Sequence, residues 1–551
     1  MNQTTNNTEA NPAALPGGDF QKGMSSAENL SIHRPEEDQG AAAANKWLVA
    51  IAVIVPTILE VVDGTVVTVA LPYIQGSLNA GVDEVAWVLT SYLVANGIVI
   101  PLTGWLSALF GRKRFFLLCI VLFTLSSFLC GAAINLPMLI VFRLVQGASG
   151  AAMIPLSQAI LLETFPPKEH GMAMAMWGIG VMFAPIVGPV LGGWLTDHYS
   201  WRWAFYINVP LGALGFMLTS AFVHDPPYVK RALSTIDYLG LGLLTIGIGG
   251  AQIVLDRGER ADWFAEAWVW WMSGTAGVAL LTFILWELRH AAPIVDFRLL
   301  RNRTYTVSLL LNTVLGFVLY SSVTLQPLFA QMLMGYDAVS AGIMMAPGGI
   351  ATLFTMPLVG VLMNRMDARW LLVVGMAVTS YSIVMVSHLT LDVAMWQLSW
   401  PRIVWGFGMG FYFVPLSAVA IGVVSKEKMG DASALFNLMR NLGGSVGVAL
   451  AVTLLSRRSQ FHQHILTSHI SPYDPQTQEQ FSYLWRRLVQ SGVDPLSAQA
   501  QAGQLIYMEV QRQSLLMAFL DNFWIIGMAA LVCVPLIFFM RRFKGGAMVG
   551  H

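Results

Sequence analysis

Long apolar segments alternate with short polar ones from residue 45 almost to the end of the chain. Each apolar segment has roughly the 20 residues that an α-helix needs to cross the hydrocarbon core of a membrane. The pattern therefore predicts an all-α membrane protein with fourteen transmembrane helices. The expected spans are 47–70, 86–109, 115–134, 138–162, 172–195, 203–223, 237–255, 267–288, 305–330, 338–363, 370–390, 399–424, 433–456 and 522–540.

Positively charged residues indicate how these spans are oriented. Lysine and arginine gather in every second loop, whereas the short loops on the other side hold only Arg202, Arg257 and Arg260. Because basic loops stay on the cytoplasmic side, we expect both termini in the cytoplasm. The long polar connection 457–521 then lies outside. Its amphipathic stretches indicate either a surface helical pair that covers the outer mouth or a docking surface for a partner protein.

The two halves of the chain repeat one short pattern. Arg-x-x-x-Gly followed by Pro-Leu-Ser occurs at 143–157 and again at 402–417. Duplicated helical bundles are typical of transporters that open alternately to the two sides of a membrane. The register predicts two bundles of six helices with two extra helices between them. We expect a disordered cytoplasmic tail at 1–44, an N-terminal six-helix bundle at 45–224, two additional transmembrane helices with their linkers at 225–304, a C-terminal six-helix bundle including the external loop 457–521 at 305–545, and a short tail at 546–551.

Composition supports the membrane assignment and narrows the chemistry. Of the 551 residues, 56% are hydrophobic and 11% are charged, against roughly 25% charged residues in soluble domains. The net charge of +0 gives no bulk attraction to nucleic acid. There is no Gly-Lys dipeptide, hence no Walker A loop, and no His-Glu-x-x-His motif. We expect a protein that is not an enzyme and that has no cofactor, metal or catalytic residue.

Three charged residues within the spans are candidates for proton coupling. Glu60 and Asp63 are three residues apart and so share one helix face. Asp63 and Arg143 lie at similar depths, roughly 12 Å and 9 Å from the outer ends of their spans. Burial favours a neutral carboxyl, and a nearby arginine favours its charged form. Moving either the arginine or water would therefore change proton affinity. The alternative is a static ion pair that holds two helices in register.

Other polar residues within the spans are candidates for a substrate cavity. As single residues, each is equally well explained by a hydrogen bond between helices. Arg440 lies near the cytoplasmic end of its span, where it either snorkels or makes a gating contact. Arg402 lies near an outer end, where we expect it to be interfacial. The cavity candidates are Asn96, Gln146, Gln158, Asn312, Tyr320, Gln326, Asn437 and Arg440.

Glycines and prolines mark two places where the bundles could move. The fifth span is rich in both residue types, which indicates either tight packing or a pliable interface that can rock and reseal. The basic turn after the second span indicates either a cytoplasmic anchor or a latch between states. The residues are Gly178, Pro185, Gly188, Pro189 and Gly192 in the fifth span, and Gly104, Gly111 and Arg112 at the turn.

These motifs together resemble the major facilitator superfamily, and within it the fourteen-span drug:proton antiporters of the EmrB/QacA type. The resemblance rests on four segments: 63–72 in span 1, 104–114 in the loop after span 2, 139–147 in span 4 and 178–193 in span 5. It implies the major facilitator fold and a role for Arg143 in proton transfer. The loop motif departs from the family at Ala108 and Leu109, where an acidic and a basic residue are usual.

Two further segments resemble the EmrB branch of that family: residues 201–210 and the long external loop. Members of this branch are inner-membrane pumps that work with an EmrA-like periplasmic membrane-fusion adaptor and a TolC-type outer-membrane channel. The resemblance implies a proton-coupled multidrug efflux transporter of the bacterial inner membrane, exporting hydrophobic compounds. Two alternatives stay open: a dedicated exporter of one amphiphile, such as a fatty acid or siderophore, and a non-transporting membrane sensor or scaffold.

Overall fold

The fold is built almost entirely from helices. The computed structural model describes residues 37–225, 237–290, 293–471, 473–544 and 547–548. Residues 46–551 form one compact unit, and the packing described below is internal to it. The first group of helices comprises α1 (Glu37–Ser77), α2 (Val82–Val85), α3 (Trp87–Val99), η1 (Ile100–Leu102), α4 (Thr103–Phe110), α5 (Arg112–Gly131), α6 (Leu136–Gly150), α7 (Met153–Thr164), η2 (Pro167–Glu169), α8 (His170–His198), α9 (Trp203–Tyr206) and α10 (Asn208–Phe222).

A middle segment and a second group follow. The middle segment contains α11 (Tyr238–Arg257), η3 (Trp263–Ala265), α12 (Ala267–Glu287) and η4 (Phe297–Arg301). The second group contains α13 (Arg303–Met334), α14 (Ala338–Leu362), α15 (Ala368–Val386), α16 (Met395–Gly422), η5 (Lys426–Lys428), α17 (Met429–Ser468), α18 (Pro475–Gln490), α19 (Pro495–Val532) and η6 (Val534–Phe539). A two-residue antiparallel pairing of β1 (Phe543–Lys544) with β2 (Ala547–Met548) comes last.

Thirteen helices or helix pairs in the described part of the chain are long and apolar enough to cross a membrane. They correspond to thirteen of the predicted spans. The remaining predicted span, 172–195, lies within α8, whose side chains at Pro185, Ile186 and Pro189 are outside the described residues. Of the predicted N-terminal tail, residues 1–36 are outside the described residues, and α1 begins at Glu37. The chain is a multi-pass membrane protein.

Local sequence explains where the helices break and begin. Pro101 has no backbone N–H to donate, and the second span changes from α3 through η1 to α4 at this residue. Asn135, Asn302 and Asp337 each accept a backbone N–H at the start of α6, α13 and α14, as good N-caps do. Gly111 separates α4 from α5 with φ 86°, a conformation that favours glycine.

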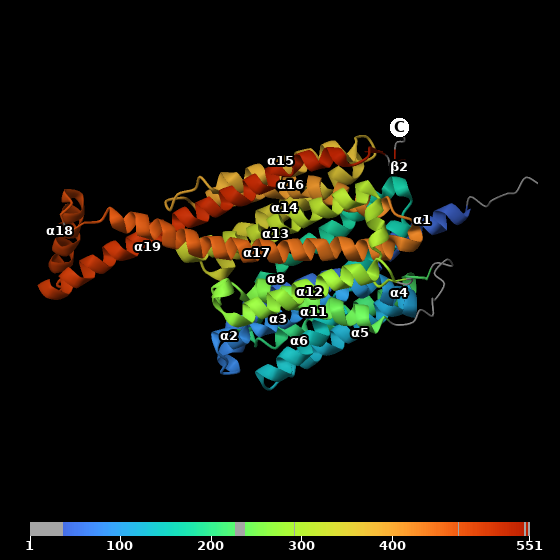
Figure 1. Cartoon of the computed structure of the whole chain (residues 1–551), viewed down its shortest axis with the longest axis horizontal. Coiled ribbons are helices and arrows are strands. Elements are labelled where there is room, and N and C mark those ends of the chain that lie inside the picture. Colours follow the sequence, from blue (N-terminus) through green and yellow to red (C-terminus); the bar gives the residue numbers. More distant parts are fainter. Residues whose placement is uncertain (1–36, 226–236, 291–292, 472, 545–546, 549–551) are drawn as a thin grey trace, which may run out of the picture. The chain divides into compact units, whose positions relative to one another are not determined.

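The two groups meet through the same helices of each repeat. α8 of the first group packs on α14 of the second, and α17 of the second packs on α3, α4 and α7 of the first. In the repeat register, spans 5 and 13 are counterparts, as are spans 2 and 10. Each fifth helix therefore meets the second helix of the other group, as expected for a duplicated fold. The extra helices α11 and α12 pack on each other, and α11 also contacts α3 and α17 (Figure 1).

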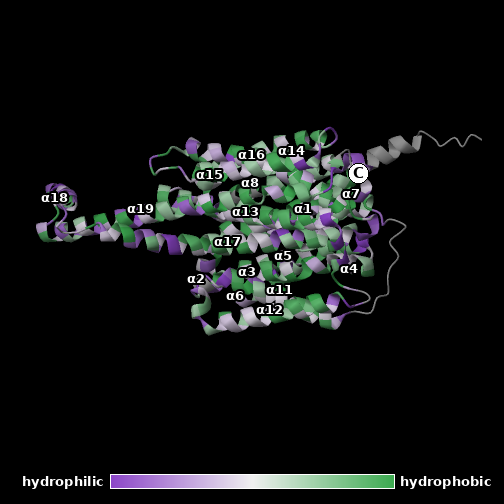
Figure 2. Cartoon of the chain, turned by 45° about the horizontal axis from the view of Figure 1, so that its top comes forward, coloured by the Kyte–Doolittle hydropathy of each residue, from purple (hydrophilic) through white to green (hydrophobic). Residues whose placement is uncertain are grey.

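The predicted external loop is largely helical. α17 and α19 continue past the other helices as an antiparallel pair, and α18 packs on α19 (Figure 1). No residue of α18 is buried, and hydrophilic residues gather on it (Figure 2). Hydrogen bonds from Thr477 to Asp474 begin α18 and lower the pKa of the Asp474 carboxyl. We call residues 457–521 the outer hairpin. Its projection contradicts the expectation of a helical pair lying over the outer mouth.

A glycine contact joins α13 to α17 closely. A Cβ added at Gly443 would lie 2.1 Å from the carbonyl oxygen of Thr313, so the backbones themselves touch. Alanine at this position must push the two helices apart. By contrast, a Cβ at Gly274 in α12 meets nothing within 4 Å. The two positions form a matched pair for testing this packing.

We predict that Gly443→Ala lowers the melting temperature of the detergent-purified protein, because overpacking a tight contact costs about 1–3 kcal/mol. Gly274→Ala is the control and should melt at or slightly above the wild-type temperature. Intrinsic fluorescence during heating measures both. Equal melting of the two variants would show that α13 and α17 are not packed at this distance.

Candidate functional site

A buried carboxylate on α1 is the centre of a polar network in the first group. Asp63 Oδ2 lies 2.7 Å from Arg143 Nη1 of α6, and both side chains are completely buried. Asp63 Oδ1 accepts hydrogen bonds from Gln146 Nε2 at 2.8 Å and Asn208 Nδ2 at 2.7 Å. Each oxygen of the acid is thus bound by donors from other helices. We call these four residues the Asp63 network.

Further contacts hold the guanidinium of Arg143 in place. Its Nε donates to the carbonyl oxygen of Val88 at 3.1 Å, and its Nη1 also donates to Gln146 Oε1 at 2.8 Å. The ring of Tyr92 stacks against it at 4.2 Å. The remaining nitrogen, Nη2, is buried and has no hydrogen-bond partner among the described residues. The arginine is therefore fixed on one side and has spare donor capacity on the other.

Asn208 is the member of the network that the sequence analysis missed as a site residue. It is fully buried, and its Nδ2 bridges Asp63 and Ser127 Oγ, the latter at 2.9 Å. It lies at the start of α10, within the segment 201–210 that supports the family resemblance. A lone uncharged residue within a predicted span is usually explained by a hydrogen bond between helices. Only that motif could have drawn attention to Asn208.

Glu60, one turn from Asp63, has a different environment. Its Oε1 accepts a hydrogen bond from Asn96 Nδ2 of α3 at 3.1 Å. Its Oε2 is buried without a hydrogen-bond partner among the described residues. The guanidinium of Arg440 on α17 interacts with it electrostatically. Glu60 is therefore a weakly partnered acid on the side of α1 that faces the second group.

A cavity of about 290 Å³ lies between the two groups. It is walled by α3, α11, α13 and α17 and reaches the segment that follows α11. Two of the predicted cavity residues, Asn96 and Tyr320, line it. The other lining residues are Leu93, Gly97, Gln252, Leu255, Asp256, Glu259, Arg260, Leu438, Asn441, Leu442, Gly444, Ser445, Val448, Ala449 and Val452.

The remaining cavity candidates hydrogen-bond or pack between helices and do not line this cavity. Gln146 belongs to the Asp63 network, and Gln158 Oε1 accepts from Ser433 Oγ at 3.0 Å and Asn437 Nδ2 at 2.7 Å. This contact joins α7 to α17. Two others bond to backbone carbonyls, Asn312 to Phe436 and Gln326 to Leu398. Arg440 is buried rather than snorkelling.

Arg402, the counterpart of Arg143 in the repeat, has no acid partner in the described residues. It is almost fully buried among the side chains of the second group. Its Nη1 donates to Ser322 Oγ at 2.8 Å and Gln326 Oε1 at 3.3 Å, and it stacks on Trp405 at 4.0 Å. Neutral acceptors thus replace the carboxylate of the first copy.

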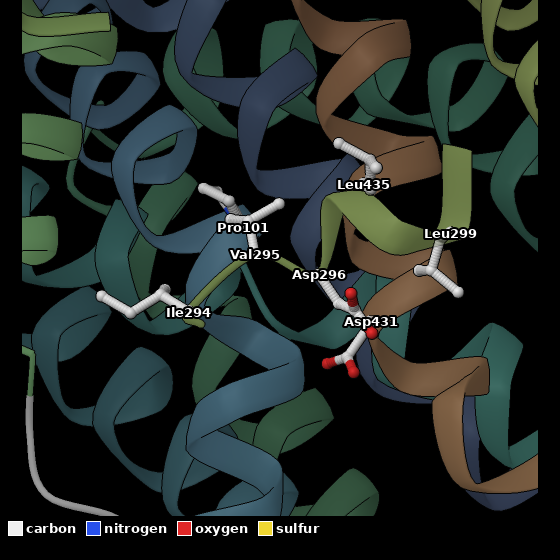
Figure 3. A pocket seen from close by; sticks show the side chains of 7 residues that line it. All are labelled: Pro101, Ile294, Val295, Asp296, Leu299, Asp431 and Leu435. Carbon is white, nitrogen blue, oxygen red and sulfur yellow. The ribbon is translucent and has the colours of Figure 1, made fainter. Parts of the chain in front are cut away.

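The end predicted to be cytoplasmic is closed by contacts between the groups. Within the first group, Arg112 of α5 forms an ion pair with Glu163 at the end of α7. Gly104 lies against Asp431 of α17, so closely that a Cβ on Gly104 would overlap the carboxylate. Figure 3 shows the carboxylates of Asp431 and Asp296 beside each other in a small pocket that Pro101 also lines. We call the contact between Gly104 and Asp431, which joins the two groups, the inner latch.

The glycines of α8 face two different helices. A Cβ on Gly178 would lie 2.5 Å from the Met356 sulfur of α14, so this glycine is at the interface between the groups. Gly188 and Gly192 instead lie against Thr65 and Val66 of α1, within the first group. The side chains of Pro185 and Pro189 are outside the described residues. In the described part of the chain, no group of three or more His, Cys, Asp or Glu residues could hold a metal ion.

Comparisons with known proteins agree with this geometry. The family model described as Major Facilitator Superfamily matches residues 55–448. The multidrug export protein EmrB of Haemophilus influenzae is 36% identical over 90% of this chain and 95% of its own length. The fatty acid resistance protein FarB of Neisseria gonorrhoeae is 36% identical over 82% of this chain and 89% of its own. The predicted resemblance is confirmed.

A solved structure supports the fold at low sequence identity. The proton:xylose symporter XylE superimposes with a TM-score of 0.59 at 12% identity, covering 91% of this chain and 97% of its own. At this identity the likeness shows the fold alone. The predicted fold class is confirmed as the fold of this superfamily.

We predict that Arg143→Ala lowers the melting temperature strongly, because removing one partner of a buried ion pair costs about 3–5 kcal/mol. The loss should be largest at alkaline pH, where the Asp63 carboxyl must remain charged without its partner. Adding Asp63→Asn to this variant should restore much of the stability. Thermal unfolding at acidic and alkaline pH measures the three proteins.

Arg402→Ala is the matched control, since it removes a buried arginine that has no acid partner. Its loss of stability should not depend on pH over the same range. If the stability loss of Arg143→Ala is also independent of pH, or if adding Asp63→Asn fails to restore the melting temperature, Arg143 does not compensate a charge on Asp63.

Proposed function

The chain belongs to the major facilitator superfamily, and on that premise we propose that it is a proton-coupled exporter of hydrophobic compounds. The observation that carries the proposal is the buried acid at Asp63, bound by Arg143 and lying one turn from the weakly partnered Glu60. Two such acids in one helix, beside a cavity between the two groups, supply proton sites next to a substrate site. The EmrB relative is a multidrug export protein, and the similarity to it supports an export function.

Proton transfer would depend on two opposing effects on the Asp63 carboxyl: burial favours its neutral form, and pairing with Arg143 favours its charged form. In the present geometry Asp63 is matched by the guanidinium of Arg143 and by two amide donors. If the conformational change also shifts α6 relative to α1 within the first group and moves Arg143 away, the carboxylate loses its compensating charge and binds a proton instead. The ion pair and the protonated acid would thus belong to different conformations, and this links proton binding to the opening of the bundle.

The present conformation would be the one that faces outward. The inner latch and the Gln158–Asn437 contact join the groups at the end predicted to be cytoplasmic. The cavity instead reaches Arg260, beyond the outer end of α11. Substrate would leave from this state after protons arrive from the outside. We place the protein in the bacterial inner membrane with both termini in the cytoplasm, from the distribution of basic loops.

A periplasmic partner fits the outer hairpin. α18 has no buried residue, and Tyr473, Tyr483 and Leu496 are exposed by 90%, 58% and 79%. Exposed large apolar residues on a projecting element are typical of a protein-binding surface. We propose an EmrA-like membrane-fusion adaptor as the occupant, with a TolC-type channel beyond it. The pump would then be one component of a tripartite efflux system.

A dedicated exporter of one amphiphile is the second candidate. The FarB relative, a fatty acid resistance protein, supports it. The cavity suits either function, since its walls are mostly apolar with a few amide and hydroxyl groups and the charged residues Asp256, Glu259 and Arg260. The two candidate functions differ in the range of compounds that are exported. A multidrug exporter accepts several unrelated dyes, whereas a dedicated exporter moves only one amphiphile such as a fatty acid.

We predict that dye efflux from proteoliposomes requires an imposed pH gradient and is lost in Asp63→Asn and Arg143→Ala. Asp337→Asn is the control, because Asp337 only caps α14 at the surface. Fluorescence of a membrane-permeant dye follows the transport. Unchanged efflux in both network variants would contradict the coupling assignment, as would efflux driven by membrane potential alone.

We predict that replacing Tyr473, Tyr483 and Leu496 together by serine abolishes co-purification with the adaptor encoded by the same organism. The exposed side chains make no buried contacts, so insertion and melting temperature should stay at wild-type values. The control is the same set of substitutions on the exposed α12 residues Val278, Leu281 and Leu285. Adaptor binding that survives the hairpin substitutions would place the docking site elsewhere.

A further inference from the structure

Two amide side chains connect Glu60 to the cavity. Asn96 Nδ2 donates to Glu60 Oε1 at 3.1 Å, and Asn441 Nδ2 of α17 donates to Asn96 Oδ1 at 3.4 Å. Both asparagines line the cavity, whereas Glu60 lies behind them. The carbonyl oxygen of the last amide, Asn441 Oδ1, is buried and has no hydrogen-bond partner among the described residues. We call Glu60, Asn96 and Asn441 the amide chain.

The charge on Glu60 determines which end of each amide donates and which end accepts along the amide chain. A carboxylate can only accept hydrogen bonds, and each asparagine has a donor end and an acceptor end. With Glu60 charged, Asn96 must turn its NH2 toward the acid and its oxygen toward Asn441. Asn441 must then turn its NH2 toward Asn96. The group left without a partner is then an acceptor, the buried Asn441 Oδ1, on a side chain that lines the cavity.

A proton on Glu60 favours the reverse direction. The new O–H is a donor in a buried position, and a buried donor without an acceptor costs about 1–3 kcal/mol. Asn96 supplies the acceptor when its amide rotates, because Oδ1 then faces Glu60. The NH2 of Asn96 next binds Asn441 Oδ1, and the NH2 of Asn441 is left for the cavity. The group offered to the cavity changes from an acceptor to a donor.

We propose that Asn441 is a substrate-binding residue whose hydrogen-bonding character is set by the proton on Glu60 through Asn96. The ligand class is an uncharged apolar molecule that carries a hydrogen-bond donor, such as a phenol, hydroxyl or N–H group. Its donor binds Asn441 Oδ1 while Glu60 is charged. Protonation of Glu60 reverses the amide chain, removes that acceptor and releases the ligand. This inference rests on the proposed function and gives it a substrate class.

The walls around Asn441 suit such a ligand. Leu93, Leu255, Leu438 and Leu442 line the same cavity and would contact its apolar body. The other amide of the wall, Gln252, is already paired with Ser445, to which its Nε2 donates at 2.9 Å and from which its Oε1 accepts at 3.1 Å. Gln252 therefore has no link to Glu60 and is a matched control on the facing helix α11.

Other ionisable groups surround Glu60 and must be held constant in a test. Arg440 of α17 and Asp63 of α1 interact with it electrostatically, and the Asp63 charge is compensated by Arg143 of α6. Tyr92 of α3 and Cys119 of α5 also interact with Glu60 electrostatically. None of these groups lines the cavity. Changes at Asn96 and Asn441 therefore interrupt the amide chain without removing a charge.

The test uses two probes that differ in one hydrogen-bond donor: 1-naphthol and its methyl ether, 1-methoxynaphthalene. Binding of each to the full-length protein in lipid nanodiscs is measured by calorimetry at mildly acidic and mildly alkaline pH. We expect 1-naphthol to bind roughly tenfold more tightly at alkaline pH, a factor in line with one buried hydrogen bond. The ether should bind with the same affinity at both pH values.

The variants isolate the amide chain. Asn96→Leu and Asn441→Leu should each abolish the pH dependence of 1-naphthol binding while leaving binding of the ether unchanged. Glu60→Gln, whose amide can donate permanently to Asn96, should bind 1-naphthol weakly at both pH values. Gln252→Leu should keep the wild-type pH dependence. Two leucine variants are used so that a folding defect in one still leaves a test.

Three outcomes would overturn the proposal. One is a pH dependence of 1-naphthol binding that survives in both leucine variants, and another is an equal pH dependence for the ether. In either case gradient-driven dye efflux that still needs Asp63 leaves the proposed function standing. If neither probe binds the wild-type protein, the cavity is not the substrate site, and both the inference and that part of the proposed function fail.

Discussion

The charge of Asp63 inside an apolar bundle is the constraint on which the first group depends. A buried carboxylate is stable only when nearby groups compensate its charge and fill its hydrogen-bonding positions. Here α6 supplies Arg143 and Gln146, and α10 supplies Asn208. Three helices are thereby held at one point by contacts that no apolar side chain could replace. The same demand would make the bundle sensitive to a proton, because protonation removes the need for all three donors at once.

Depth arguments predicted part of this site from the sequence, since Asp63 and Arg143 lie at similar distances from the outer ends of their spans. Apolar length also predicted the spans, and the repeated motif predicted two six-helix bundles with two extra helices between them. The sequence does not show rotation about a helix axis. For that reason Asn208 was missed, and the contact of Arg402 with Ser322 was not predicted. The polarity of a residue indicates that it needs a partner but does not identify the partner.

Duplication of the fold has not duplicated its chemistry. The first copy holds its arginine with a carboxylate, whereas the second holds Arg402 with neutral groups. The inner latch is also unequal. The loop motif lacks the usual acid at Ala108, and an acid of the other group, Asp431, lies against Gly104 instead. In the proposed mechanism the two groups would contribute different parts: the first would supply the proton sites, and the second, through α17, would supply the surface that the first moves against.

α17 takes part in several of the contacts between the two groups that the proposed cycle would change. Its 40 residues are one continuous helix of about 60 Å. Asp431 at one end belongs to the inner latch, Asn441 lines the cavity, and the far end forms the outer hairpin. A stiff rod that pivots near its middle magnifies a small tilt at the pivot into a larger sweep at its tip. In the proposed cycle, tilting of α17 would move the outer hairpin. A protein bound to the hairpin would therefore be displaced each time the pump opens or closes.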